Sequence, residues 1–353
     1  GDVTDGFVWG RGTLDDKTTV LSILEAVETL LAQGFQPPRD VYLTFGHDEE
    51  VGGRFGARVI VDTLVARGVA PALVLDEGGF LASDLIPGLS GRTAIIGIAE
   101  KGYLTLRLTA HAAGGHSSMP AGRTAVGALS RAIAALEANP FPYKLEGATR
   151  TMLTESAPYA SFGQRMLLAN LWLTSHMMRT RLRENPLGAA LLHTTTSPTI
   201  LSAGIKDNVL PPEAAAAVNF RIVPGETTAS VIERVRAIIA DTLITVEPAD
   251  SAFVDPSPVS DITGPEYRLV AETVQGLAPG EALPVVPYLV MGGTDAKYWG
   301  AHSDRVYRFL PIPLGDGDRE RVHGLDERVA VDAYLSAVRF FGRLLRGLDA
   351  LER

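Results

Sequence analysis

The feature that most constrains the fold is an alternation of helical and strand patterns near the start of the chain. Apolar residues repeat at helical spacing over residues 18–33, and Gly34 follows as a C-cap. The β-branched and aromatic run at residues 41–45 predicts a buried strand, and a helical stretch and a second strand follow at residues 54–67 and 72–75. Strand, helix and strand with short connections predict parallel pairing through a right-handed crossover. We therefore expect an α/β fold here.

From about residue 100 the pattern changes to that of a smaller unit. Six predicted segments follow one another in the order strand, helix, strand, strand, helix, strand, at residues 103–110, 124–138, 199–203, 214–222, 229–243 and 244–247. This is the ferredoxin-like split βαβ order. Residues 140–198 interrupt it as an insertion, and its apolar stretch at residues 166–173 is more typical of core or lid packing than of a membrane contact.

The α/β pattern returns after residue 256, with predicted strands at residues 285–291 and 305–310 and a long amphipathic helix over residues 329–345. The smaller unit is therefore inserted into the larger one. We expect a discontinuous catalytic domain and an inserted domain, formed by residues 1–99 with 253–353 and by residues 100–252.

Composition excludes several classes of protein. The 353 residues suit two domains, and the net charge of −9 argues against nucleic acid or an anionic membrane as a partner. No apolar run approaches the roughly 20 residues of a membrane helix. Because the chain has no Cys, disulfides and thiolate metal sites are excluded, and any metal must be bound by His and carboxylates.

Four acidic or His-bearing runs lie where a predicted strand ends or a loop begins: GRGTLDDK, GHDEEVGG, LDEGG and VHGLDE. Each alone has a simpler interpretation, namely a helix N-cap, a solvated loop or a structural His. Together they would crowd negative charge at the carboxyl ends of strands, which is costly without a cation. Oxygen ligands with some imidazole suit zinc, or a harder ion such as manganese or cobalt.

Eight runs, in order along nearly the whole chain, resemble the carboxypeptidase S and aminoacylase family of dizinc metallopeptidases: GRGTLDDK, GHDEEVGG, LDEGG, GGHSSMP, DNVLP, NFRIVPG, GGTDAK and HGLDE. Relatives of that family include glutamate carboxypeptidase, succinyl-diaminopimelate desuccinylase and carnosinase. The resemblance implies a zinc-exopeptidase-like, mostly parallel sheet with helices on both faces, and an inserted ferredoxin-like α+β lid that also mediates homodimerisation. It also implies hydrolysis of a peptide or N-acyl amino-acid amide bond beside a free carboxylate, with two Zn²⁺ per intact subunit, or Co²⁺ or Mn²⁺ in their place.

The same resemblance implies a metal-binding set. Asp15 would bridge both metals, and its peptide bond to the next residue would be cis. Glu50 and His323 would bind one metal, and Asp76 the other. Glu49 would be the general base that takes the proton of the attacking water and delivers it to the leaving amine.

Three further residues would act from the inserted domain. His116 would stabilise the oxyanion, often from the partner subunit of a dimer. Asn208 would contact substrate, and Arg221 would bind its carboxylate, which a guanidinium can do in bidentate fashion. The alternative for Arg221 is a salt bridge on a strand.

The run GGTDAK would supply further substrate contacts through Gly293, Thr294 and Lys297. Many relatives have Arg at the last position, and Lys keeps the charge but loses the planar fork. We expect His47 not to be a ligand and His176 to be structural.

One departure concerns the second metal. The family has a His-x-Asp segment upstream of the bridging aspartate, and no His precedes Asp15 here. Asp15, Glu50 and His323 would therefore complete one metal site, while the site of Asp76 would lack a ligand. We interpret the chain as lacking an N-terminal part, including any targeting region, which leaves the compartment open. We expect this chain alone to bind one metal well, the other poorly, and to have little activity.

Two other classes of protein compete with this interpretation. A non-catalytic remnant would keep the fold and at most one metal. A serine hydrolase is disfavoured because Ser117-Ser118 lacks the Gly-x-Ser-x-Gly elbow and lies in the inserted domain. The sequence leaves open peptides or N-acyl amino acids as substrates, and the identity of the side chain.

Overall fold

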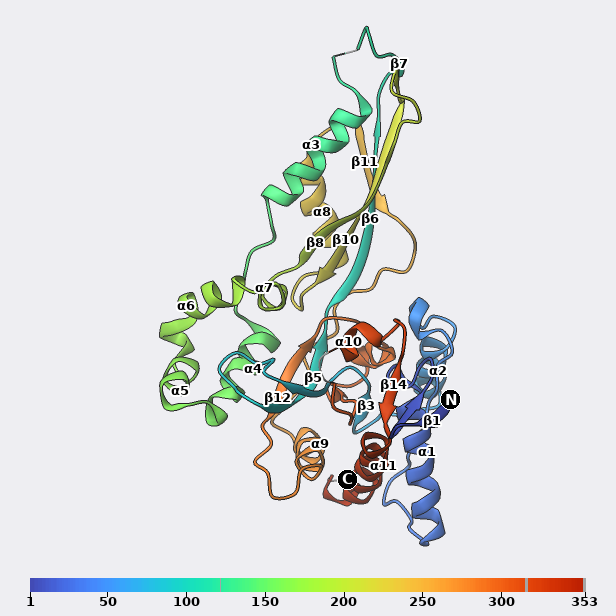
Figure 1. Ribbon diagram of the computed structural model, residues 1–353, viewed down its shortest axis with the longest axis vertical. Coiled ribbons are helices and arrows are strands. Elements are labelled where there is room, and N and C mark those ends of the chain that lie inside the picture. Colours follow the sequence, from blue (N-terminus) through green and yellow to red (C-terminus); the bar gives the residue numbers. More distant parts are fainter. Residues whose placement is uncertain (121, 315–316, 352–353) are drawn as a thin grey trace.

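The computed structural model describes residues 1–120, 122–314 and 317–351. The molecule is elongated, with a lower portion that holds both termini and an upper portion built on a separate sheet (Figure 1). None of the helices in the described ranges is long and apolar enough to cross a membrane.

The lower portion is organised around a five-stranded mixed sheet. Its strands, from one edge to the other, are β12 (Val285–Val290), β5 (Arg92–Glu100), β13 (Val306–Arg308) and β3 (Val74–Asp76), and β4 (Phe80–Ser83) also pairs with β5. Pairing is parallel between β12 and β5 and between β13 and β3, and antiparallel between β13 and β5 and between β4 and β5. All of β12 and nearly all of β5 is buried, as expected of apolar strands covered on both faces.

Helices pack around this sheet and complete the α/β class that the sequence predicts. They are α1 (Lys17–Ala32), α2 (Ala57–Ala66), α4 (Gly147–Ser156), α9 (Pro265–Gln275) and α11 (Val331–Arg346). The amphipathic α11 buries Phe340 and Phe341 and contacts both α1 and α9, while α4 packs against β12. A small sheet of β1 (Asp2–Thr4), β2 (Phe7–Trp9) and β14 (Arg328–Ala330) lies beside α1 (Figure 1).

The predicted strand at residues 41–45 is wrong. The segment has no strand partner in the described part of the chain, and Val41, Tyr42 and Phe45 are all more than a third exposed. The β3 strand takes β13 as its parallel partner instead, so the predicted crossover does not form. Apolar, β-branched residues favour a strand only where a neighbouring strand completes its hydrogen bonds.

The upper portion is an antiparallel sheet in the order β11 (Ile244–Pro248), β6 (Gly102–His111), β10 (Glu213–Ile222) and β8 (Thr195–Ala203). The helices α3 (Ala125–Ala138) and α8 (Thr228–Ile239) pack on it around a second apolar core. Along the chain these elements follow the predicted strand-helix-strand-strand-helix-strand order. Two short strands, β7 (Gly115–His116) and β9 (Val209–Leu210), pair at the far tip.

The insertion between α3 and β8 is helical. It contains α4 followed by α5 (Phe162–Leu168), α6 (Leu171–Arg183) and α7 (Pro186–Leu192). Buried residues of these helices, among them Met152, Leu168 and Leu191, belong to the same apolar cluster as β5 and β12. The insertion therefore packs in the lower core, and it lies on the opposite side of Figure 1 from α1.

Candidate metal centre

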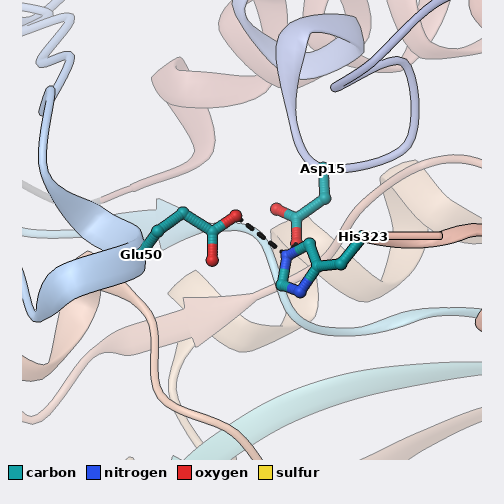
Figure 2. A group of neighbouring side chains, drawn as sticks. All are labelled: Asp15, Glu50 and His323. Atoms are coloured by element: carbon teal, nitrogen blue, oxygen red, sulfur yellow. Dashed lines mark hydrogen bonds and ion pairs between the residues drawn. The ribbon is translucent and has the colours of Figure 1, made fainter.

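Three predicted ligands converge from distant parts of the chain. Asp15 lies in the turn before α1, Glu50 in the short 3-10 helix Glu49–Val51, and His323 just after α10 (Asp318–Arg321). Each offers a ligand atom within 4.8 Å of those of the other two. His323 Nε2 is 3.1 Å from Asp15 Oδ2 and 2.8 Å from Glu50 Oε1. Figure 2 shows the three side chains pointing toward one another.

The turn that presents Asp15 is held by a buried carboxylate. Glu327 accepts hydrogen bonds from the backbone N–H groups of Gly12, Leu14 and Asp15, at 2.9, 2.8 and 3.3 Å. Arg11 Nη1 also donates to Glu327, at 2.8 Å. These contacts lower the pKa of Glu327 although burial opposes the shift. Its carboxylate therefore stays charged and fixes the loop, a role that sequence reasoning missed although the HGLDE run contains the residue.

Two of the ligand residues have unusual backbone geometry. The Asp15-Asp16 peptide bond is cis, as the resemblance implied. Asp16 caps α1, where its Oδ1 accepts a hydrogen bond from Thr19 N at 3.2 Å. His323 has a φ of 60°, in the left-handed region that non-glycine residues seldom adopt. Such conformations cluster at functional sites, where the surroundings hold them in place.

The neighbouring glutamates Glu49 and Glu50 have different surroundings. Glu50 is exposed and points to His323 (Figure 2). The pKa of Glu49 is raised to about 7, chiefly by burial, and the charges of Asp295, Glu50 and Asp15 add to the rise while Lys297 opposes it. Glu49 is thus a desolvated carboxyl beside the cluster, which is the environment that a general base needs.

Asp76 ends β3 and is not a member of the three-residue cluster found in the described ranges. Its Oδ2 accepts a hydrogen bond from Ala296 N at 2.6 Å, which ties the strand end to the loop that contains Thr294. Burial and the charge of Asp76 raise the pKa of the adjacent Glu77 well above its ordinary value. Burial likewise raises the pKa of Asp16 to about 7.

The raised pKa values have a common cause. Burial, together with neighbouring carboxylates, disfavours the charged forms of Asp15, Asp16, Glu49, Glu77 and Asp295. A divalent cation among these groups would reverse that penalty, because it favours ionised carboxylates. The donor set of carboxylate oxygens and one imidazole nitrogen fits zinc, manganese or cobalt. The residues present therefore fit a bound divalent cation.

The predicted GGTDAK residues lie beside Asp76. Thr294 is buried, and its Oγ1 donates to Glu100 Oε1 at 2.5 Å, while Gly293 is exposed and Lys297 is half-buried. Glu100 also forms a buried ion pair with Arg308. This pair fixes the loop from beneath, and the sequence analysis missed it because the two residues are far apart in the chain and belong to no common motif.

The structure does not bring two other predicted residues to the cluster. His116 lies at the tip of the upper portion, and Asn208 lies next to it, where its carbonyl accepts a hydrogen bond from Ser117 N at 3.1 Å. In Figure 1 this tip is at the far end of the upper portion, whereas α10 and α1 lie in the lower portion. A single chain therefore does not join His116 to Asp15.

Arg221 lies at the base of the upper sheet, where its guanidinium is 4.9 Å from the centre of the Tyr103 ring. It is half-buried, and burial lowers its pKa. The ion pairs of the described residues include none that involves Arg221, so the salt-bridge interpretation gains no support from its surroundings. His47 is exposed and outside the cluster. His176 contacts Arg179 on the surface of α6, at 3.2 Å.

A carboxylate and imidazole cluster on an α/β fold, with the half-buried carboxyl of Glu49 beside it, defines a candidate metal-dependent hydrolase. The chain belongs to the peptidase family M20/M25/M40, whose sequence profile matches residues 1–347.

Curated relatives agree with this membership. The probable carboxypeptidase S-like 2 of Dictyostelium discoideum is 38% identical over 351 residues, which are 99% of this chain and 67% of that protein. The N-fatty-acyl-amino acid synthase/hydrolase PM20D1 of Homo sapiens is 39% identical over 348 residues, which are 98% of this chain and 68% of that protein. The chain thus spans about two thirds of the length of each.

Solved structures share the fold. The M20 family metallo-carboxypeptidase Sso-CP2 of Sulfolobus solfataricus has a TM-score of 0.69 at 17% identity, covering 99% of this chain and 79% of that one. Human carnosine dipeptidase 1 has a TM-score of 0.65 at 14% identity, covering 99% of this chain and 74% of that one. By its family, the protein is a metal-dependent hydrolase that acts on amide bonds.

Proposed function

We propose that the protein hydrolyses a peptide or N-acyl amino-acid amide bond next to a free carboxylate, using a two-metal centre. The observation that carries this proposal is the convergence of Asp15, Glu50 and His323 next to the half-buried Glu49. The names of the relatives, carboxypeptidase S-like protein and N-fatty-acyl-amino acid synthase/hydrolase, support this substrate class. Membership of a family of hydrolases, with relatives named as a carboxypeptidase and a hydrolase, disfavours a non-catalytic remnant.

Asp15, Glu50 and His323 would hold one cation, and Asp15 with Asp76 would hold the other. Zn²⁺ is the proposed ion, with Co²⁺ or Mn²⁺ as substitutes. Bound cations supply Lewis acidity, which lowers the pKa of water and polarises the amide carbonyl. Asp15 lies with Glu50 and His323 in one cluster, and the charges of Asp15 and Asp76 both raise the pKa of Asp16, so Asp15 is the member placed to bridge.

Glu49 would move the proton. Its carboxylate takes a proton from the attacking water and delivers it to the amine that leaves. Burial favours this transfer because a desolvated carboxylate binds a proton more tightly, which the raised pKa of about 7 expresses. Bound cations lower that pKa and keep Glu49 in the accepting, ionised form.

The substrate carboxylate would be bound by the positively charged side chains of Arg221 and Lys297. Arg221 is half-buried and stacked on Tyr103, so its fork is held in place for a carboxylate. Lys297 lies near Glu49 on the loop that also carries Gly293 and Thr294. This arrangement would select substrates by the free carboxylate next to the scissile bond.

A homodimer would complete the site. The edge strand β8 exposes Ile200 and Leu201, both about two thirds exposed, so a second copy can pair or pack there. Such a dimer would let the tip with His116 and Asn208 reach the metal centre of the partner. His116 would then stabilise the oxyanion.

Paired substrates test the proposal. N-acyl amino acids and dipeptides are compared with the same compounds carrying a carboxamide in place of the carboxylate, with Zn²⁺, Co²⁺ or Mn²⁺ added. We expect hydrolysis of the free acids alone, and its loss on chelation. The rate should be low, because the second cation has only Asp15 and Asp76 as proposed ligands. Equal hydrolysis of the carboxamides would contradict recognition of the carboxylate, and metal binding without hydrolysis of any of them would favour the remnant.

A further inference from the structure

A cavity lies within the helical insertion, apart from the metal centre. It has a volume of about 290 Å³ and is formed between the turn after β4 and the helices α5, α6 and α7. Its described lining residues are Leu85, Pro87, Gly88, Gln164, Leu167, Leu168, Met178, Arg181, Leu182, Asn185, Leu187, Gly188 and Leu191. None of them belongs to the metal centre, and the insertion lies on the opposite side of Figure 1 from α1, whose first turn follows Asp15.

The chemistry of the lining is that of a site for an apolar chain. Leucine and methionine side chains make up most of its walls, with Gln164 and Asn185 as neutral polar groups. Asn185 is occupied as the cap of α7, where its Oδ1 accepts from Leu187 N at 2.8 Å. Small-molecule sites are typically apolar concavities with a few polar groups that fix orientation.

Arg181 is the one charged residue among the described lining residues. Its guanidinium is exposed, and the ion pairs and hydrogen bonds of the described residues include none from it. An Arg at the rim of an apolar cavity can bind an anionic head group while the chain of the ligand lies inside.

The helices α5 and α6 around the cavity also favour an anionic ligand. Residues 162–183, which form α5 and α6, contain four Arg and no Asp or Glu, in a chain whose net charge is −9. The same two helices expose Phe162, Trp172 and Leu173, at 81%, 75% and 69%. A cationic and apolar surface within an acidic protein marks this face as one for an amphiphilic anion.

We infer that this cavity binds the alkyl chain of a single-chain amphiphilic carboxylate, of the fatty-acid or long-chain N-acyl amino-acid class, with Arg181 at its head group. The site is separate from the metal centre, so it does not depend on the proposed hydrolytic reaction. The cavity is small, so it takes a segment of chain of limited length.

Calorimetric titration with saturated fatty acids of six, eight, ten and twelve carbons tests the inference. Burial of each added methylene contributes about 0.8 kcal/mol, so affinity is expected to rise about 4-fold per methylene until the cavity is filled and then to level off. Decanoate is expected to bind more tightly than decylamine. Affinity that is independent of chain length, or equal for the two head groups, would overturn the inference.

Substitutions of residues that line the cavity test where decanoate binds. Leu187 is half-buried in the cavity wall, and Leu187→Trp is expected to fill the space and weaken decanoate binding at least 10-fold. Arg181→Glu is expected to weaken it about 10-fold, whereas Arg150→Glu, on the exposed surface of α4 and outside both the lining and residues 162–183, serves as the control and is expected to change it less than 2-fold. Unchanged binding to both Leu187→Trp and Arg181→Glu would contradict the site.

A control separates this cavity from the metal centre, where a carboxylate could also bind. Asp15→Asn is expected to leave decanoate affinity unchanged, since Asp15 is remote from the cavity. If Asp15→Asn abolishes binding while Leu187→Trp does not, the chain binds at the metal centre and the inference fails. Thermal unfolding of each variant confirms that it is folded.

Discussion

The metal centre and the sheet of the upper portion are built in opposite ways. The centre is assembled from three short loops, and the side chains of Glu50 and His323 are both 60% exposed. The upper sheet is a continuous antiparallel ladder in which Leu104, Leu106 and Leu108 are fully buried. The loops therefore keep their polar atoms available for a ligand. The packed upper sheet is an arm that holds His116, on β7, at its tip.

The two regions also differ in the free-energy cost of ionising their carboxyl groups. Raised carboxyl pKa values gather around the loops of the centre, whereas the core of the upper sheet is apolar. The centre therefore stores an electrostatic cost that a bound cation relieves, and the sheet gains its stability from burial. Changes at the loops should act on metal binding and activity, and changes at the junction of the two regions should act on stability.

The largest loss of activity is expected when a proposed metal-binding residue is replaced. Glu50→Gln removes one of the three charged or imidazole groups of the cluster, and activity should fall at least 1,000-fold, which steady-state kinetics with added Zn²⁺ would measure. His47→Ala is the matched control, because His47 is exposed on the adjacent loop and outside the cluster. A larger loss in His47→Ala than in Glu50→Gln would contradict the ligand set.

Glu49→Gln should separate chemistry from metal binding. General-base catalysis contributes about 10²- to 10⁴-fold, so kcat is expected to fall by that factor. Because Glu49 is not a proposed ligand, metal content measured by mass spectrometry should stay at the wild-type value. Loss of the metal together with activity would show that Glu49 holds the cation, which the assignment of roles does not allow.

His116→Ala tests whether the arm delivers an oxyanion donor to the metal centre of the partner subunit. Loss of an oxyanion donor typically lowers kcat about 10²- to 10³-fold, and this change should leave metal content unchanged. If the arm acts on the partner, an equal mixture of His116→Ala and Glu49→Gln subunits should regain about a quarter of the wild-type activity, because some sites then contain neither substitution. Failure of the mixed dimers to regain activity would mean that His116 acts elsewhere.

The smallest effect on activity is expected where β5 joins β6, at Lys101, whose Nζ donates to the carbonyl oxygens of Ala190 and His193, at 2.9 and 3.0 Å. Burial lowers the pKa of Lys101 to about 7. Between that value and its unfolded pKa of about 10.4, the unfolded chain binds the extra proton, so folding stability rises with pH.

The free energy of unfolding of wild type minus that of Lys101→Gln should therefore increase from pH 7 to pH 10, by at most about 1.4 kcal/mol per pH unit. Denaturant titrations at each pH measure this difference. A flat or falling difference would show that Lys101 stays charged in the folded protein.

Much of the upper sheet could be predicted from the sequence because its strands and helices carry complete local patterns. The predicted helix at residues 124–138 and strand at residues 103–110 match α3 and β6 within one residue at each end. The segment at residues 41–45 shows the limit of this reasoning, because a pattern of apolar residues does not reveal whether a partner strand is present.

The metal centre was predictable for a different reason. Asp15, Glu50 and His323 lie in acidic and His-bearing runs that resemble those of one family, so their convergence could be expected without any knowledge of the backbone. The supporting contacts could not, because Glu327 acts on the Asp15 loop through long-range hydrogen bonds and Glu100 pairs with Arg308 across the sheet. Such pairings depend on the tertiary fold and carry no local signal.

Asp15, Glu50 and His323 should form one complete cation site in this chain. Calorimetric titration of the metal-free protein with Zn²⁺, repeated on His323→Ala, measures this binding. We expect about one tightly bound Zn²⁺ per wild-type chain, any second ion bound much more weakly, and loss of the tight site in His323→Ala. Absence of tight binding to wild type, or equal binding to His323→Ala, would show that these residues do not form the site.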